Sequence, residues 1–228
     1  MDSLLAHPDL MRIEELFEPG HTIAWEFLSG FEWPWEALPG IRDCIIENGA
    51  SLDAAEYNEL PGNVWIHRTA VIAPTAFIGS HVIIGAGTQV RHCAFIRENA
   101  LIGASAVIGN STELKNVILF DGVQVPHYNY VGDSILGHKS HMGAGSITSN
   151  VKSDHSIVSV VCGDSRIETG MRKFGAIIGD HVEIGCNSVL NPGCVIGPHT
   201  SVYPLSMVRG YIPEGSIYKR QGEVSERR

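Results

Sequence analysis

Residues 66–114 read IHRTAVIAPTAFIGSHVIIGAGTQVRHCAFIRENALIGASAVIGNSTEL. Within this stretch an aliphatic residue recurs at every sixth position without a miss. The positions are Ile66, Ile72, Ile78, Ile84, Val90, Ile96, Ile102, Ile108 and Leu114. A period of six matches neither the 3.6-residue turn of a helix nor the two-residue alternation of an ordinary strand. It is typical of a parallel β-helix, in which three six-residue steps make one triangular coil.

The period continues, with interruptions, almost to the end of the chain. Two steps of five residues occur, the first of them after Leu114, and the pattern breaks at about 149–172 before it resumes. We therefore predict an all-β fold: a β-helix over 63–210, with a loop or arm extruded at about 149–172. Residues 211–228 are expected to form a solvated C-terminal tail.

Residues 1–62 lack the period and contain short helical stretches separated by Pro-Gly and Ser-Gly breaks. Aromatic side chains are dense in this segment: Phe17, Trp25, Phe27, Phe31, Trp33 and Trp35. A β-helix ends in an open apolar coil with unpaired strand edges, so we interpret 1–62 as a short helical cap on that end. The alternative is an aromatic ligand pocket.

Composition limits the classes of partner and compartment. A formal net charge of -9 argues against nucleic acid or an anionic membrane as the main partner. No apolar run approaches the roughly 18 residues of a membrane span, and the first residues lack the apolar core of a signal peptide. The 5 cysteines form no CxxC pair, which predicts reduced thiols in a cytoplasmic protein.

Two cations are predicted to stack at one corner of the prism. Arg97 and Lys115 each directly follow an aliphatic position and lie three steps apart, so they should be separated by one coil, about 5 Å, and point outward. Two stacked cations repel each other, and proteins use such pairs to hold an anion such as a phosphate. The alternative is that Glu98 and Glu113 neutralise them.

The next corner carries His127, which the coil geometry predicts within roughly 10 Å of the two cations. A neutral imidazole is the commonest general base near pH 7, although a solvated turn residue is the simpler interpretation. One coil further, the backbone N–H of Ala144 could act as an oxyanion donor. A zinc site with His138 and His141 is the metal alternative; because no second histidine stacks on His127, we predict no metal.

The segment His127-Tyr-Asn-Tyr-Val-Gly-Asp133, followed by Gly143-Ala-Gly-Ser-Ile-Thr-Ser-Asn150, resembles a motif pair of the glucosamine-1-phosphate N-acetyltransferase domain. In that family the domain is a left-handed β-helix and forms the C-terminal half of the bifunctional bacterial enzyme that makes UDP-N-acetylglucosamine. The segment Lys173-Phe-Gly-Ala-Ile-Ile-Gly-Asp180 is similar to the family's next motif. The resemblance covers about residues 64–212.

The resemblance implies an acetyl-CoA-dependent N-acetyltransferase that acts on an amino-sugar 1-phosphate, either glucosamine 1-phosphate or an epimer. It implies that His127 is the base on the sugar amine and that Ala144 and Cys186 line the acetyl-CoA channel. The residues it implies around the sugar phosphate are Arg97, Glu113, Lys115, Tyr130, His141, Asn150 and Lys173. It also implies a homotrimer with each site between neighbouring prisms.

The chain departs from the family's pattern at three site positions. His141 replaces an asparagine, Val151 replaces a tyrosine and Cys186 replaces a serine, and the arm after Asn150 is longer than the family's loop. The segment before the repeat is too short for a nucleotidyltransferase domain, so we expect no uridylyl transfer. A second hypothesis is therefore a trimeric scaffold or sugar-phosphate sensor without transfer chemistry, and a third is a β-helix carbonic anhydrase with zinc.

Overall fold

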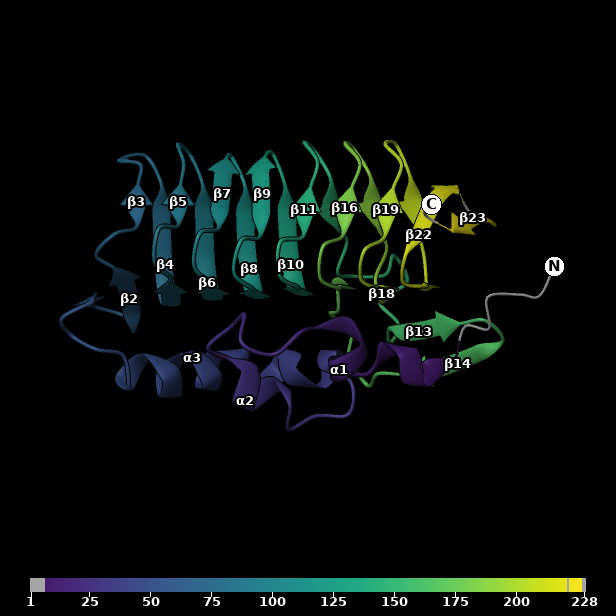
Figure 1. Ribbon diagram of the computed structural model, residues 1–228, viewed down its shortest axis with the longest axis horizontal. Helices are drawn as coiled ribbons and strands as arrows, with labels where there is room; N and C mark the ends of the chain where they lie inside the picture. Colours follow the sequence, from purple (N-terminus) through teal and green to yellow (C-terminus); the bar gives the residue numbers. More distant parts are fainter. Residues whose placement is uncertain (1–6, 221, 227–228) are drawn as a thin grey trace.

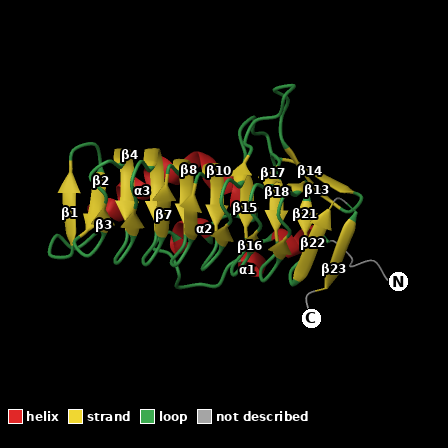
Figure 2. Cartoon of the chain, turned by 90° about the horizontal axis from the view of Figure 1, so that it is seen from above, coloured by secondary structure: helices red, strands yellow, loops and turns green. Residues whose placement is uncertain are grey.

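The structure, a computed structural model, describes residues 7–220 and 222–226. It is a long parallel β-helix with three faces (Figures 1 and 2), so the predicted fold is confirmed. Successive coils pair at the predicted interval of three steps, as for Ile78 and Ile96, or at one position less where a step is short, as for Leu114 and Val131. The aliphatic positions of the repeat fill the interior of the prism.

One sheet wraps around two faces of the prism. Its strands are β1 (Tyr57–Leu60), β2 (Val64–His67), β4 (Phe77–Ile84), β6 (Phe95–Ile102), β8 (Glu113–Leu119), β10 (Tyr130–Leu136), β12 (Ile147–Thr148), β15 (Ala176–Ile178), β17 (Val189–Leu190), β18 (Cys194–Ile196), β20 (Met207–Val208) and β21 (Tyr211–Ile212). Strands β4, β6, β8 and β10 are long because each turns a corner. Their C-terminal halves, with β2, β15, β18 and β21, form the covered face; their N-terminal halves, with β12, β17 and β20, form the third face.

A second sheet forms the remaining face, the second face. Its strands are β3 (Val71–Ile72), β5 (Gln89–Val90), β7 (Val107–Asn110), β9 (Gln124–His127), β11 (His141–Met142), β16 (Glu183–Ile184), β19 (Ser201–Val202), β22 (Ser216–Arg220) and β23 (Glu223–Glu226). The chain passes from the covered face to the second and then to the third face. We name each corner by the face it follows: the first corner follows the covered face, the second corner the second face, and the third corner the third face.

The arm after Asn150 contains an antiparallel hairpin of β13 (Ser159–Cys162) and β14 (Ser165–Glu168). The prism continues across it, because Leu136 before the arm pairs directly with Ile178 beyond it. The inserted residues therefore leave the coil at the third corner and return to it without disturbing the stacking.

The N-terminal segment lies lengthwise along the covered face (Figure 1), so the prediction that it caps one end of the prism is wrong. Its elements are η1 (Pro8–Met11), α1 (Ile13–Leu16), α2 (Trp25–Leu28), η2 (Pro34–Gly40) and α3 (Ile41–Ala50). Helix α3 packs against β4, β6 and β8, and η2 packs against β10. No helix in the described part of the chain is both long and apolar enough to cross a membrane.

A row of outward-facing apolar side chains explains this placement. In each coil of the covered face the residue before the interior aliphatic position is apolar and buried, with 0 to 9% of its surface exposed. The row is Trp65, Ile83, Leu101, Ile118, Ile135, Ile177, Val195 and Tyr211. The equivalent row on the second face includes Gln89, Gln124 and Glu183. Covering the apolar row of the covered face removes it from water, which is favourable and accounts for the position of the N-terminal segment there.

The aromatic residues of the N-terminal segment belong to this packing. Phe17 and Trp35 are buried, with Phe17 against Phe120 and Trp35 against Phe174, at ring-centroid distances of 4.9 and 5.9 Å. The remaining aromatic side chains are partly buried against the same core. They serve as the cover of the prism, which argues against the aromatic ligand pocket.

Both ends of the prism carry an antiparallel strand. Strand β1 pairs with β2 at one end, and β23 pairs with β22 at the other. An antiparallel partner occupies an edge that would otherwise be open to another chain. The prediction of a solvated tail after residue 210 is therefore wrong for 211–220 and 222–226. These residues continue the prism and add the β22–β23 pair, and Tyr218, which is 1% exposed, fills the interior as an aliphatic residue does in earlier coils.

The N-terminal segment is also held by polar contacts at the first corner. The ring of His21 stacks on that of His138, with centroids 3.7 Å apart. The buried Asp180 carboxylate accepts the backbone N–H of Glu18 at 2.7 Å and that of His138 at 2.6 Å. Burial, followed by the charges of His21, Lys139 and His181, lowers the pKa of His138.

We expect a residue of the apolar row on the covered face to contribute more to the free energy of unfolding than a residue at the same repeat position on the second face. Ile135→Ala should lower the free energy of unfolding by about 2–5 kcal/mol, because it leaves a cavity under η2. Val71→Ala, at the equivalent position on the second face and 65% exposed, should change it by less than about 0.5 kcal/mol. Urea denaturation measures both, and equal effects would contradict this role of the row.

We also expect stability to fall as the pH decreases below about 6.5, the ordinary pKa of histidine. The folded state lowers the pKa of His138, so the unfolded chain binds the proton more readily and protonation favours unfolding. Burial raises the pKa of Asp180, which acts in the opposite direction. His138→Gln should reduce the loss of urea midpoint between pH 8 and pH 5.5; an unchanged loss would exclude His138 as its source.

Candidate functional site

The Asp133 carboxylate is the centre of a polar network at the third corner. Its side chain is 5% exposed, and its Oδ1 accepts from Lys115 Nζ at 3.0 Å and from Asn116 Nδ2 at 3.1 Å. Its Oδ2 accepts from Asn150 Nδ2 at 2.5 Å. Three donors thus satisfy a buried carboxylate, which would be costly to bury alone.

The spacing of the chain brings these groups together. Asn116, Asp133 and Asn150 follow one another at the interval of one shortened coil, so they occupy the same corner in successive coils. Asn116 and Asp133 have positive φ angles of 55° and 47°, a backbone conformation that Asn and Asp tolerate better than most residues. This evenly spaced series of side-chain amides and a carboxylate was a detectable signal that the sequence analysis missed.

The network also reaches the N-terminal segment. Asn116 Nδ2 donates to the carbonyl oxygen of Leu38, in η2, at 3.1 Å as well as to Asp133. The base of the arm is tied to the same place, because the N–H of Phe174 donates to the carbonyl oxygen of Asn150. The N-terminal segment, the prism and the arm therefore meet at one corner.

The cations at this corner are not the unpaired stack that the sequence predicted. Lys115 is bound to Asp133, and Arg97 Nη1 pairs with Glu113 Oε1 at 3.0 Å. The second pairing matches the alternative that Glu113 neutralises a cation. The prediction of a bare cation pair is wrong because the next coil supplies a carboxylate to each cation, Glu113 from the third face and Asp133 from the third corner.

Tyr130 joins the third face to this network. Its hydroxyl accepts from Asn150 Nδ2 at 3.2 Å. Its ring end lies next to Gly132, where a Cβ atom would displace the Tyr130 side chain. Burial, together with the charge of Asp133, raises the pKa of Tyr130, which keeps the phenol neutral and able to donate a hydrogen bond.

The predicted base and the two predicted acetyl-CoA residues, namely His127, Ala144 and Cys186, form a ladder along the second corner. The N–H of Gly145 donates to the carbonyl oxygen of His127 at 3.0 Å, and the N–H of Asn187 donates to that of Ala144 at 2.8 Å. His127, Ala144 and Cys186 therefore occupy the same corner in successive coils. The side chains of His127 and Cys186 are exposed, and Ala144 is partly exposed.

Asn129, which the sequence analysis did not single out, holds this ladder. Its Oδ1 accepts the N–H of His127 at 3.0 Å. Its Nδ2 donates to the carbonyl oxygens of Gly143 and Ser146 at 2.9 and 3.0 Å. The buried amide thus connects the backbone at His127 to the next coil, beside Ala144.

Within one chain the two groups occupy opposite edges of the third face. His127 and Asp133 are separated by six residues of chain, which spans up to about 20 Å when extended.

Two predicted substrate residues lie outside both the His127 ladder and the Asp133 network. His141 is on the second face, where its Nδ1 lies 2.8 Å from Glu183 Oε2, and Lys173 is exposed at the end of the arm without an ion pair to any described residue. Among the described residues no group of three or more His, Cys, Asp or Glu side chains is arranged to hold a metal ion.

Residues 87–212 match the family model described as the GMPPB C-terminal domain. The chain belongs to this family. It is 31% identical over 201 residues to YaiX of Escherichia coli K12, whose name describes an uncharacterized acetyltransferase, and the match covers 79% of this chain and 86% of YaiX. Together these matches confirm the predicted membership of the hexapeptide-repeat acetyltransferases.

Longer relatives match over part of their length. The bifunctional sugar-1-phosphate nucleotidylyltransferase/acetyltransferase of Sulfurisphaera tokodaii is 37% identical over 109 residues, 48% of this chain and 27% of that protein. The bifunctional protein GlmU of Methanococcus maripaludis strain S2 is 35% identical over 190 residues, 82% of this chain and 46% of GlmU. The chain thus spans between about a quarter and a half of these two relatives.

We expect the ion pair of Lys115 to be a structural requirement. Lys115→Met should lower the free energy of unfolding by about 3–5 kcal/mol, because it leaves the Asp133 carboxylate buried without its cation. Asp133→Asn in the same chain should restore much of that loss. Arg97→Met is the control: its ion pair is 42% and 33% exposed, so the loss should be about 0–1 kcal/mol by urea denaturation. Equal losses for Lys115→Met and Arg97→Met would contradict the buried pair.

Proposed function

We propose that the chain is an acetyl-CoA-dependent N-acetyltransferase whose acceptor is the amine of an amino-sugar 1-phosphate. The observation that carries the proposal is the ladder of His127, Ala144 and Cys186 along the second corner. In this ladder the exposed imidazole of His127 lies one coil from the partly exposed Ala144, and Cys186, one coil further along the same corner, is also exposed. The names of the relatives, which include acetyltransferases and sugar-1-phosphate enzymes, support the same reaction class.

His127 acts as the general base. The amine nitrogen attacks the thioester carbonyl, a C–N bond forms and the C–S bond breaks, and the imidazole takes the amine proton and returns it to the departing thiolate. Asn129 fixes the backbone of His127 without contacting its ring, so the ring stays free for the substrate. The backbone N–H of Ala144 serves the developing oxyanion, and Cys186 contacts the acyl donor further along the corner.

The sugar phosphate binds along the third corner and the adjoining third face. Arg97 is the available cation, because its side chain is 42% exposed, whereas Lys115 is committed to Asp133. Tyr130 and Asn150 offer a phenol and an amide next to it. Lys115 and Asp133 act on the substrate indirectly, by holding Asn150 in position.

We propose that a homotrimer completes the site. The base and the sugar-phosphate residues lie at opposite edges of the third face within one chain, so a single prism does not bring them together. Packing prisms around a threefold axis would place the second corner of one copy against the third corner of its neighbour. The covered face is unavailable for this contact because the N-terminal segment already occupies it.

A sugar-phosphate-binding protein without transfer chemistry is the second candidate. The observation in its favour is that His141 and Lys115, two residues implied to bind the sugar phosphate, are engaged with Glu183 and Asp133. Release of free CoA thiol from acetyl-CoA, measured over a panel of amino-sugar 1-phosphates, separates the two functions. Binding of a sugar phosphate without thiol release would favour the second candidate.

We expect His127→Ala to lower kcat by about 10²–10⁴-fold, the usual contribution of a general base. The KM for the sugar phosphate should change little, because the base does not bind the phosphate. The control is His92→Ala, an exposed histidine on the same corner whose ring contacts Thr75. A His127→Ala enzyme with near wild-type turnover would remove His127 from the mechanism.

A further inference from the structure

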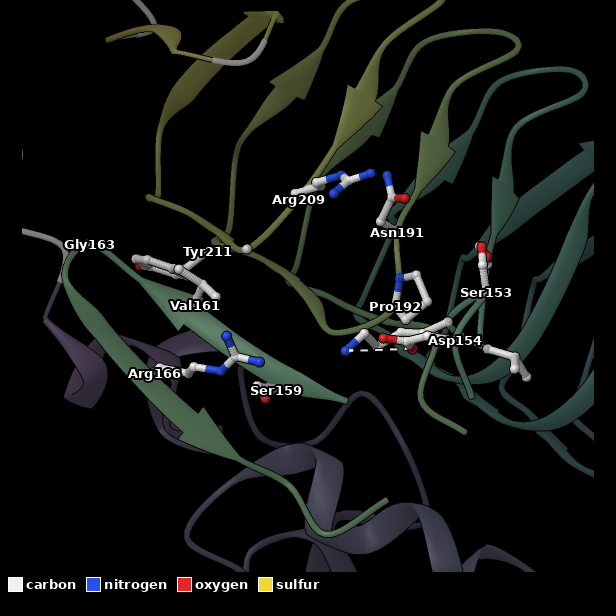
Figure 3. Close-up of a pocket in the computed structure, with 14 residues that line it drawn as sticks. Ser153, Asp154, Ser159, Val161, Gly163, Arg166, Asn191, Pro192, Arg209 and Tyr211 are labelled. Atoms are coloured by element: carbon white, nitrogen blue, oxygen red, sulfur yellow. Dashed lines mark ion pairs between the residues drawn. The ribbon is translucent and has the colours of Figure 1, made fainter. Parts of the chain in front are cut away.

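The arm and the end of the prism enclose a cleft of about 790 Å³ that the proposed reaction does not use. One wall is the β13–β14 hairpin together with residues 151–154, and the opposite wall is the third corner where it carries Asn191 and Arg209 (Figure 3). The volume lies within the usual range of small-molecule sites, about 300–1,000 Å³. The cleft is on a different corner from the His127 ladder; it lies beside Asn150 on the third corner, but none of its lining residues has a role in the proposed reaction.

The hairpin is packed firmly enough to serve as a wall. Val158, Val160 and Cys162 are buried, with at most 1% exposed, while the alternate residues of β13 face the cleft. Two glycines of the prism, Gly193 and Gly210, let the hairpin approach. A Cβ atom would lie 2.8 Å from Val158 Cγ1 at the first and 2.7 Å from the carbonyl oxygen of Val161 at the second.

Two guanidinium groups lie on the two walls. Arg166 extends from β14 and Arg209 follows β20, and Figure 3 shows their side chains on opposite sides of the cleft. Neither forms an ion pair with any described residue, whereas Arg97 and Lys115 do. The lysine of the cleft, Lys152, is engaged by its own loop, through Ser156 Oγ at 2.5 Å and the Asp154 carboxylate at 4.0 Å.

The electrostatic balance of the cleft differs from that of the whole chain. In a protein of net charge -9, two arginines without carboxylate partners on facing walls create a local attraction for anions. Guanidinium forks bind phosphate oxygens bidentately and keep their charge at all relevant pH values. The lining of the cleft also includes the apolar side chains of Val151, Val161 and Pro192, which suit a planar ring.

We propose that this cleft binds the diphosphate group of a nucleotide, with Arg166 and Arg209 each holding phosphate oxygens from one wall. The base or sugar of the ligand packs against Val151, Val161 and Pro192. The site depends on the inserted arm, because β14 supplies one of the two arginines. It is a binding site additional to the proposed acetyl transfer, and it stands whether or not His127 is a base.

Isothermal titration calorimetry on the full chain tests the proposal, with ADP, UDP, inorganic pyrophosphate, CoA and adenosine as titrants. Wild-type protein should bind the titrants that carry a diphosphate and should not bind adenosine. Arg166→Gln and Arg209→Gln should each weaken binding by about tenfold to a hundredfold, the loss of charge-assisted hydrogen bonds. Arg166→Lys keeps the charge but loses the fork, so it should give a smaller loss.

Arg91→Gln is the matched control, because it removes an exposed arginine on the second corner and should leave binding unchanged. Melting temperatures of all variants verify that they are folded. Arginine-dependent binding of CoA but of no other diphosphate would overturn the proposal, because the cleft would then hold the acyl donor of the proposed reaction and not an additional nucleotide. Absence of binding of every diphosphate titrant, equal binding of adenosine, or affinities unchanged by both glutamine variants would overturn the proposal.

Discussion

Parallel hydrogen bonds between successive coils determine which side chains of this protein are neighbours. Each residue of the prism lies beside its counterpart one coil away along the chain, so a side chain in one coil acquires its partner from the next. The turn at each corner depends on residues with positive φ, among them Asn116 and Asp133. A side chain at a corner is therefore held by backbone geometry before any side-chain contact forms, which makes the corners suitable places for polar groups.

The polar network at the third corner couples parts of the chain that are distant in sequence. Asp133 accepts hydrogen bonds from the coils on both sides. Asn116, one of its donors, also donates to the carbonyl oxygen of Leu38 in the N-terminal segment. Because a buried carboxylate is stable only with its donors in place, the N-terminal segment contributes to the order of the corner although it lies outside the prism. The same corner accommodates the arm, since the coils before and after it pair directly.

The repeat and the motif at the second corner were predictable from sequence because both depend on local spacing. A six-residue aliphatic period specifies the coil, and the interval of one shortened coil specifies that Ala144 stacks on His127. The pairings of the cations were not predictable in the same way. Whether Lys115 meets another cation or Asp133 depends on side-chain directions at a corner, which the period leaves open.

What the sequence by itself determined is therefore the prism, its register within unbroken stretches of the repeat, and the stacking of Ala144 on His127. The alignment of Cys186 with these two residues depends on how the coils pair across the arm. The tertiary structure alone decided where residues 7–56 lie. The repeat shows that one face of the prism carries an apolar row, but it does not show whether another protein or a segment of the same chain covers that row. It also decided that the arm folds back against the prism to make a cleft, since the contact of β13 with Gly193 and Gly210 joins segments unrelated by the repeat.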